Sequence, residues 1–249
     1  MNILITGASS GIGKDMARIF HQMGHTLYLV ARREALLSKL KAELDDAPEI
    51  IVLDLSEEEN CYTLYEMLKD KNIDVLINNA GFGAFGEFTD IPLDRELKMV
   101  DLNIRAVHIL TKKFLADFKA RDFGYILNVA SSAAFLPGPL MSVYYATKAY
   151  VQRLTLAIHE ELRRSKSRVY VGVLCPGPVD TEFNKTANVR FNLKSLQSEA
   201  VAAYAIKKML RKKLVIIPGL IIRMGVFFQR FLPTKLLLKI SYGIQKNKG

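Results

Sequence analysis

The feature that most constrains the fold is an alternation of short apolar runs with longer, helix-like segments along the 249 residues. The apolar runs predict seven strands, at Ile3–Thr6, Thr26–Ala31, Glu49–Leu53, Val75–Asn78, Tyr125–Val129, Tyr170–Leu174 and Val215–Ile217. Strands that are apolar throughout and separated by helices are typical of a parallel sheet buried on both faces. The alternation therefore predicts an α/β fold with a doubly wound, seven-stranded parallel sheet and helices on both faces.

The segments between the strands predict helices at Gly11–Met23, Glu34–Leu44, Glu57–Lys69, Asp94–Phe118 (with a break), Val143–Arg164 and Ser198–Arg211. No Pro/Ser-rich linker, low-complexity tract or repeat interrupts this order. We therefore expect residues 1–249 to form one domain.

The composition of the chain says little about its binding partners. The net charge is +10, and Glu199 is the only acidic residue after Phe183. Such a charge suits a phosphorylated ligand, anionic lipid or nucleic acid, and does not by itself distinguish them. Cys61 and Cys175 have neither metal-ligand nor disulfide spacing, and the chain begins with a strand rather than a signal segment. We expect a cytoplasmic protein with no disulfide and no metal centre.

Small, polar and turn-forming residues follow each of the first six predicted strands. They are Gly7-Ala-Ser-Ser-Gly11-Ile-Gly13, Arg32-Arg33, Asp54-Leu55, Asn79-Ala80-Gly81, Ser131-Ser132 and Pro176-Gly177-Pro178. Doubly wound sheets bind ligands beyond the carboxyl ends of their strands. Six such loops at one edge of the sheet predict one long cleft.

The first loop, TGASSGIGKD at Thr6–Asp15, matches neither common phosphate-binding glycine pattern. A nucleotide-hydrolysing P-loop requires Gly, four residues and then Gly-Lys-Ser/Thr, but alanine stands five before Gly13 and an aspartate follows the lysine. The pattern G-x-G-x-x-G fails because Met16 stands at its third glycine. We expect a third arrangement that brings backbone N–H groups and a helix N-terminus to a pyrophosphate.

A tyrosine and a lysine in VYYATKAY have the spacing of a proton-transfer pair. Tyr144 and Lys148 are four apart and share a helical face, whereas Tyr145 is rotated by about 100° and faces elsewhere. A neighbouring ammonium favours the phenolate and brings the tyrosine pKa, ordinarily about 10, toward the working pH. Ser131 can hydrogen-bond the carbonyl oxygen that Tyr144 protonates, and Ser132 is the alternative, disfavoured by its spacing. The serine and the tyrosine form an electrophilic pair for a carbonyl that receives hydride.

At these residues the chain resembles the short-chain dehydrogenase/reductase family in its compact form, which has a Rossmann fold. The family motif T-G-x-x-x-G-x-G stands at Thr6–Gly13, N-N-A-G at Asn78–Gly81, Y-x-x-x-K at Tyr144–Lys148, and P-G at Pro176-Gly177, followed by Val179 and Thr181. The family's serine falls on Ser131 and its asparagine on Asn103. Each motif alone is weak, but the ordered set, from residue 1 to about 182, is specific.

The resemblance implies NAD(P)-dependent hydride transfer between the cofactor and a small carbonyl or alcohol substrate, with no nucleic-acid partner. In the implied catalytic set, Tyr144 is the general acid and Ser131 orients and polarises the substrate oxygen. Lys148 lowers the tyrosine pKa and binds the nicotinamide ribose, while Asn103 holds a water that links Lys148 to solvent. The alternative for Asn103 is that it only breaks a helix. A homodimer or homotetramer is expected from the resemblance.

The residues after the second strand favour NADP(H) over NAD(H). A site selective for NAD places an acid there for the ribose hydroxyls, whereas this chain has Arg32 and Arg33. Guanidinium groups match a 2′-phosphate, although the arginines are alternatively a solvated helix start. The predicted cofactor-binding residues are Gly7, Ser9, Ser10, Gly11, Ile12, Gly13, Arg32, Arg33, Asp54, Leu55, Asn79, Ala80, Gly81, Tyr144, Lys148, Pro176, Gly177, Val179 and Thr181.

The C-terminal stretch from Leu214 leaves two interpretations open. Charged residues and prolines interrupt its apolar residues, so it does not predict a transmembrane helix. It either packs over the sheet, the substrate cleft or another subunit, or forms an amphipathic element that contacts anionic lipid peripherally.

The substrate pocket is predicted from residues after Ser132, from Pro178–Ser198 and from this C-terminal segment. Phe135, Met141, Phe183 and Phe191 suggest an apolar substrate part, and the alternative is that the phenylalanines are core residues. A reductase of acyl- or lipid-linked carbonyls at a membrane surface is the alternative among enzymes. A non-catalytic NADP-binding regulator is the alternative of another class, which the intact serine, tyrosine and lysine disfavour.

Overall fold

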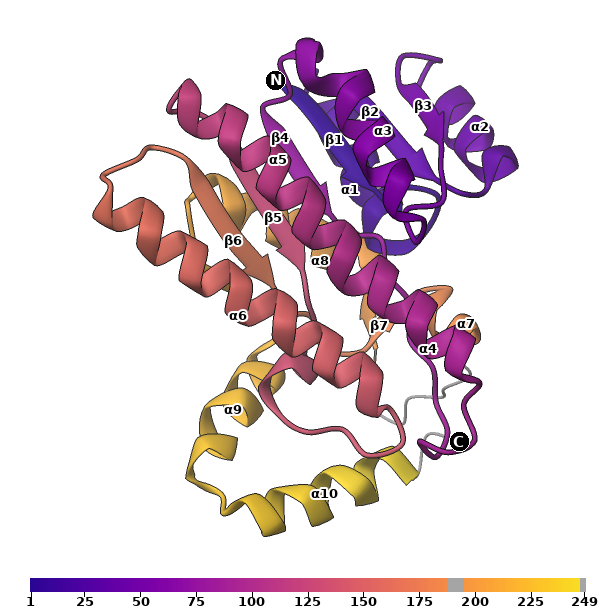
Figure 1. Cartoon of the computed structure of the whole chain (residues 1–249), viewed down its shortest axis with the longest axis vertical. Coiled ribbons are helices and arrows are strands. Elements are labelled where there is room, and N and C mark those ends of the chain that lie inside the picture. Colours follow the sequence, from indigo (N-terminus) through magenta and orange to yellow (C-terminus); the bar gives the residue numbers. More distant parts are fainter. Residues whose placement is uncertain (188–194, 247–249) are drawn as a thin grey trace.

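The computed structural model describes residues 1–187 and 195–246. Seven parallel strands form one sheet in the order β3-β2-β1-β4-β5-β6-β9 (Figure 1). They are β1 (Asn2–Thr6), β2 (Thr26–Ala31), β3 (Glu49–Val52), β4 (Val75–Asn78), β5 (Tyr125–Val129), β6 (Tyr170–Leu174) and β9 (Val215–Ile216). All seven predicted strands are confirmed, and the sheet is doubly wound as expected.

The strand order reverses beside β1, because the chain builds outward to β3 and then returns to β4 on the other side. β1 pairs with β4 in parallel, with Ile3 opposite Val75 and Ile5 opposite Ile77. The carboxyl ends of these two strands therefore lie side by side. Such a switch point is where doubly wound sheets bind ligands.

Helices cover both faces of the sheet. One layer consists of α1 (Gly11–Gln22), α2 (Glu34–Glu43) and α8 (Ser198–Leu210), and the other of α3 (Glu58–Leu68), α5 (Val107–Ala120) and α6 (Ser142–Arg164). Ile3 and Ile5 of β1 belong to the core under the first layer, and Leu4 to the core under the second. Since both faces are buried, the three central positions of β1 are all apolar, which is the pattern that the sequence displays, with the polar Asn2 and Thr6 at its two ends.

The predicted break in the long helix is a π-helical turn. Helix α4 (Leu93–Val100) continues through this turn, Asp101–Ala106, into α5. A turn of this width is uncommon and is found frequently at functional sites. It places the fully buried Asn103 beneath the loop that follows β4.

Several short elements were not predicted. They are the paired strands β7 (Val179–Asp180) and β8 (Leu196–Gln197), the helices α7 (Phe183–Ala187), α9 (Leu220–Phe228) and α10 (Thr234–Lys246), and the 3₁₀ turns Lys69–Lys71, Ser132–Phe135 and Gln229–Phe231. Two-residue strands are too short to show any periodicity. Helices α9 and α10 lie beyond the carboxyl ends of β5 and β6 (Figure 1). None of the helices within 1–187 and 195–246 is long and apolar enough to cross a membrane.

Candidate active site

A cleft of about 470 Å³ runs along the carboxyl ends of the strands. It receives side chains from the loops after β1, β2, β3, β4, β5 and β6, as the sequence predicted. The predicted site residues in its lining are Gly7, Ser9, Ser10, Gly11, Ile12, Arg32, Arg33, Asp54, Leu55, Asn79, Ala80, Gly81, Ser131, Tyr144, Lys148, Pro176, Gly177, Val179 and Thr181. Gly13 and Asn103 are not among the lining residues.

The glycines after β1 are required by the backbone and by close packing. Gly7 and Gly11 have φ angles of +66° and +54°, in the left-handed region that favours glycine. A Cβ atom on Gly13 would lie 2.5 Å from both the carbonyl oxygen of Gly7 and Nδ2 of Asn79. The first turn of α1 thus lies directly against the loop, and its N-cap residue, Ser10, makes no side-chain cap. Backbone N–H groups at this helix start are suited to a pyrophosphate.

Asn79 fixes this loop to the end of β4. Its Nδ2 donates to the carbonyl oxygens of Thr6 and Gly7 at 3.0 and 3.1 Å. The Thr6 hydroxyl in turn accepts from the backbone N–H groups of Asn79 and Ala80. The positions of the two loops at the switch point therefore depend on the Thr6 and Asn79 side chains, and Asn79 also lines the cleft.

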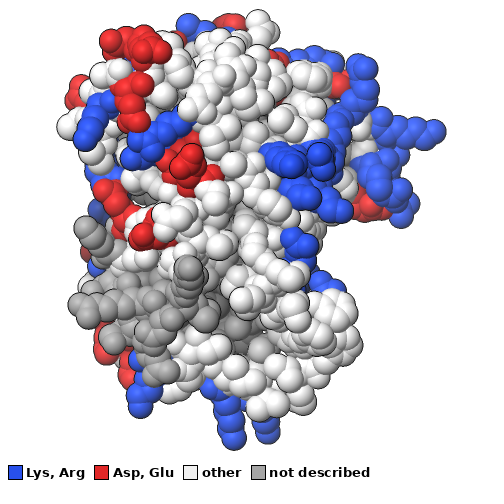
Figure 2. All heavy atoms as spheres, turned by 180° about the vertical axis from the view of Figure 1, so that it is seen from behind, with Lys and Arg blue, Asp and Glu red and all other residues white. Residues whose placement is uncertain are grey.

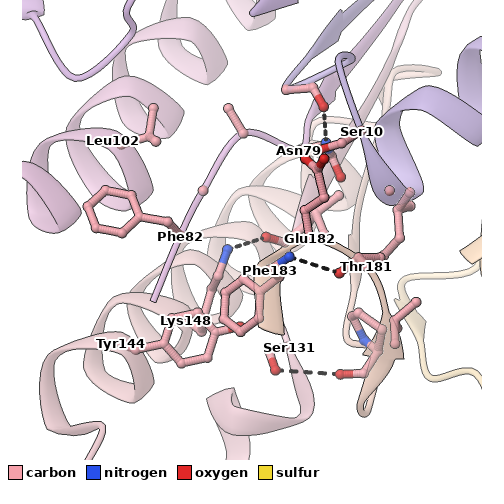
Figure 3. Close-up of a pocket in the computed structure, with 18 of the residues that line it drawn as sticks. Ser10, Asn79, Phe82, Leu102, Ser131, Tyr144, Lys148, Thr181, Glu182 and Phe183 are labelled. Atoms are coloured by element: carbon pink, nitrogen blue, oxygen red, sulfur yellow. Dashed lines mark hydrogen bonds between the residues drawn. The ribbon is translucent and has the colours of Figure 1, made fainter. Parts of the chain in front are cut away.

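Tyr144, Lys148 and Ser131 approach the same part of the cleft (Figure 3). Tyr144 and Lys148 lie on one face of α6, with Nζ 5.9 Å from the centroid of the tyrosine ring. Lys148 Nζ donates to the carbonyl oxygen of Val129 at 2.9 Å. Ser131 Oγ accepts from the backbone N–H of Ala133, which orients the hydroxyl at the end of β5. The three predicted catalytic groups are thus brought together.

Burial controls the protonation of this group. It raises the pKa of Tyr144 above its ordinary value, and a hydrogen bond with Ser131 opposes part of that rise. The net shift of the Tyr144 pKa is therefore opposite to the lowering expected from Lys148, because desolvation of the phenolate is the largest contribution. Burial lowers the pKa of Lys148 to about 8. At neutral pH, both the phenol and most of the lysine hold their protons.

Asn103 organises the floor of the cleft without lining it. Its Oδ1 accepts from the N–H of Phe82, and its Nδ2 donates to the carbonyl of Phe82 and to Thr147 Oγ1. A Cβ atom on Gly81 would lie 2.8 Å from Asn103 Oδ1 and 3.2 Å from Lys148 Nζ. Asn103 and Lys148 are thus both beneath Gly81, and Asn103 does more than break a helix.

The two predicted arginines lie at the end of the cleft formed by β2 and β3. Arg32 pairs with Asp54 at 3.3 Å, and Arg33 pairs with Glu182 at 2.7 Å. Arg33 also donates to the hydroxyls of Ser9 and Ser10. Burial alone would raise the pKa of Asp54, but hydrogen bonds within the Asp54–Ser56 turn and the charge of Arg32 hold it below its usual value. Arg33 is therefore directed toward the glycine loop, whereas the partner of Arg32 is the Asp54 carboxylate.

Apolar and aromatic side chains line the part of the cleft near Tyr144. Met141 and Phe183 lie there as predicted, with the Phe183 and Tyr144 ring centroids 5.2 Å apart. The prediction for Phe135 is wrong, because it borders a separate hollow against α9, and Phe191 lies outside the described residues. Tyr145 was expected to face elsewhere, but it also lines the cleft, with its hydroxyl hydrogen-bonded to Gln245.

Glu182 lies within the predicted pocket segment Pro178–Ser198, and Ile222 and Ile244 lie within the predicted C-terminal segment, so both segments line the cleft as expected. The individual residues were not predicted, and neither was Phe82, which also lines the cleft. No sequence pattern marks them. They reach the cleft through tertiary packing of distant segments.

Comparison with known proteins agrees with this geometry. A family model described as short chain dehydrogenase matches residues 1–190. An NADP-dependent 3-hydroxy acid dehydrogenase of Escherichia coli strain K12 is 35% identical over 198 residues, which cover 77% of each chain.

Two solved structures illustrate the range of cofactors among similar folds. A short-chain dehydrogenase from Sphingobium yanoikuyae in complex with NADPH has a TM-score of 0.83 and 34% identity, with 88% of each chain covered. One from Burkholderia phymatum in complex with NAD has a TM-score of 0.81 and 25% identity, covering 90% of this chain and 91% of its own. Similar proteins thus bind either cofactor.

Proposed function

The chain belongs to the short-chain dehydrogenase/reductase family of NAD(P)-dependent oxidoreductases, and we propose that it uses NADPH to reduce a ketone or aldehyde, or oxidises the corresponding alcohol in reverse. The convergence of Tyr144, Ser131 and Lys148 in a cleft that begins at two arginines carries this proposal. A protein that only bound the dinucleotide would have no need of this proton-donating set.

The cleft fits an extended dinucleotide. The glycine loop and the start of α1 offer backbone N–H groups to the pyrophosphate. Gly7, Gly11 and Gly13 allow the close packing of this loop against the Asn79–Ala80 loop and Thr181. Arg33, supported by the Ser9 and Ser10 hydroxyls, is placed to bind the adenosine 2′-phosphate, for which guanidinium is well matched. Asp54 and Leu55 border the adenine end, and Lys148 the ribose of the nicotinamide. The bound cofactor supplies the hydride, and the protein supplies position and electrostatics.

The chain's own residues supply the proton. Ser131 and Tyr144 hydroxyls point to one place, where they hydrogen-bond the substrate oxygen and stabilise the negative charge that develops on it. Because burial keeps the tyrosine protonated, it is a ready donor once the oxygen becomes strongly basic. The protonated Lys148 stabilises the resulting phenolate, and Asn103 positions the Gly81–Phe82 loop above the lysine. This state of protonation favours reduction over oxidation at neutral pH.

The direct test is a screen of aldehydes, ketones and acyl-linked ketones, in which oxidation of the cofactor is followed by the absorbance of the reduced nicotinamide. We expect turnover of at least one carbonyl class with NADPH, and slower turnover with NADH. Tight NADPH binding without turnover of any carbonyl would indicate a binding protein. Equal turnover with NADPH and NADH would contradict the preference for NADPH but not the proposed carbonyl reduction.

A further inference from the structure

The two C-terminal helices expose apolar side chains that the proposed function does not use. More than half of the large apolar side chains exposed on the described residues lie between Leu220 and Ile244. Those in α9 and the turn after it include Ile221, Met224, Phe228 and Phe231, which are 50 to 81% exposed. Soluble monomers rarely leave so many neighbouring apolar side chains in water, so this C-terminal apolar surface, formed by residues 220–246, indicates a partner.

Helix α10 buries polar side chains and exposes apolar ones, which is the reverse of an ordinary surface helix. Its buried residues are Ser241 and Gln245. Ser241 Oγ donates to the carbonyl of Pro137 at 2.7 Å, and Gln245 Nε2 donates to the hydroxyl of Tyr145. Its exposed residues include Leu236, Leu238, Ile240 and Tyr242. A surface helix of a soluble protein normally buries its apolar face, so α10 is suited to an apolar environment on its outer side.

The same surface is basic throughout. Residues 220–246 include no Asp or Glu, and their five cationic side chains are all exposed: Arg223, Arg230, Lys235, Lys239 and Lys246. The lysines share one side of α10, because their positions are four and seven apart. Figure 2 shows white atoms over the lower right of the molecule, with Lys and Arg side chains projecting at its lower edge. Apolar side chains bordered by cations match an anionic bilayer, in which headgroups meet the cations.

A second copy of the chain matches this surface less well. A symmetric dimer places the same patch of both subunits against itself. Here that contact would oppose cations to cations, with no carboxylate in residues 220–246 to pair with them. Charge complementarity therefore favours anionic lipid as the occupant.

The surface is also continuous with the cleft. Ile222 of α9 and Ile244 of α10 both line the cleft. Because Ile244 is also 51% exposed, it belongs both to the lining of the cleft and to the C-terminal apolar surface. An apolar molecule at the outer side of α10 would therefore pass the apolar side chains of Ile222 and Ile244 on its way to Tyr144.

We propose that residues 220–246 dock the protein on an anionic membrane surface, and that its substrate is a carbonyl on an apolar chain dissolved in that membrane. The docking stands independently of the chemistry, whereas the substrate class rests on the proposed function. The lysines contact the headgroups, and the exposed side chains of α9 and α10 enter the boundary of the acyl region.

Docking is tested by sedimentation of the full chain with vesicles of phosphatidylcholine alone or with phosphatidylglycerol added. We expect binding to the anionic vesicles, and its loss as salt rises from 0.1 M to 1 M, where the screening length falls from about 10 Å to about 3 Å. The double variant Lys235→Gln/Lys239→Gln should bind about 30-fold more weakly, given the usual contribution of each lysine near an anionic surface. Phe228→Ser/Phe231→Ser should also reduce binding.

Matched controls lie on other elements. Lys112→Gln/Lys119→Gln removes two exposed lysines of α5, and Met67→Ser removes an exposed apolar side chain of α3; both should bind vesicles as the unchanged protein does. Circular dichroism melts establish that each variant is folded. The proposal fails if the chain does not bind anionic vesicles, or if the controls lose as much binding. It also fails if the chain is a dimer in sedimentation velocity that Phe228→Ser/Phe231→Ser dissociates, since a second copy would then cover the surface.

The substrate class is tested with a long-chain ketone held in vesicles and a short, water-soluble ketone. Phe228→Ser/Phe231→Ser should lower NADPH oxidation with the first and leave it unchanged with the second. Equal turnover of the vesicle-held ketone by the variant and the unchanged protein would overturn the substrate class. Absence of turnover with either ketone would instead overturn the proposed function, and vesicle sedimentation would still decide the docking.

Discussion

Arg33 gives the most specific prediction about the cofactor. Its guanidinium contacts Glu182 at 2.7 Å, and the hydroxyls of Ser9 and Ser10 at 3.2 and 3.1 Å. A 2′-phosphate must replace the Glu182 contact, and because both side chains are about half exposed, that ion pair contributes only about 0.2–1 kcal/mol. Hydrogen bonds to charged groups contribute about 1.5–3 kcal/mol. The difference, about 0.5–2.8 kcal/mol, corresponds to about 2- to 100-fold in NADPH affinity.

We therefore expect Arg33→Ala to weaken NADPH binding within this range and to change NADH binding less than about twofold. Nicotinamide fluorescence titration measures both constants, with Arg211→Ala, a change at an exposed arginine after α8, as the control for lost charge. Glu182→Gln should tighten NADPH binding by up to about fivefold, because the competing carboxylate is removed. Equal weakening of both cofactors by Arg33→Ala would refute the assignment of Arg33 to the 2′-phosphate.

Three further predictions concern Lys148, the glycine loop and the floor of the cleft. Burial lowers the pKa of Lys148 to about 8, so the lysine loses its charge as pH rises through 8. We therefore expect kcat/KM for carbonyl reduction to fall above about pH 8. The residual activity of Lys148→Arg should not show this fall, because arginine stays charged. Gly13→Ala places a Cβ atom 2.5 Å from Gly7 O and Asn79 Nδ2. It should therefore lower the free energy of unfolding in urea by about 1–3 kcal/mol and weaken NADPH binding. The control Gly243→Ala, whose Cβ would have nothing within 4 Å, should do neither. Asn103→Ala removes the side chain that pairs with both backbone polar groups of Phe82 and donates to Thr147 Oγ1. It should lower stability by about 1–3 kcal/mol in urea unfolding. Unchanged urea midpoints would contradict this account of the cleft floor.

The sheet and most of the cleft are predictable from the sequence because they depend on local patterns. A strand buried on both faces must be apolar at every position, as Ile3, Leu4 and Ile5 are. The parallel arrangement then brings the loop residues after the strands to one edge. The spacing of Tyr144 and Lys148 likewise needs only the period of a helix.

What the sequence did not predict depends on distant contacts and on burial. Glu182 reaches Arg33 across 149 residues of chain, and no local pattern encodes such a pair. Tyr145 lies beside Gly138, where a Cβ would be 2.2 Å from the tyrosine ring, so the absence of a side chain there makes room for the ring. The direction of the Tyr144 pKa shift depends first on desolvation of the phenolate, and desolvation is a property of the folded chain that spacing in the sequence does not give.

The most direct test of the central claim compares Tyr144→Phe with Tyr145→Phe. Both tyrosines line the cleft and are adjacent in the chain, but only Tyr144 is assigned the proton transfer. We predict that Tyr144→Phe lowers kcat for carbonyl reduction by about 10²–10⁴-fold, while NADPH affinity measured by fluorescence is retained and Tyr145→Phe remains active. Turnover that survives Tyr144→Phe but is lost in Tyr145→Phe would contradict the account.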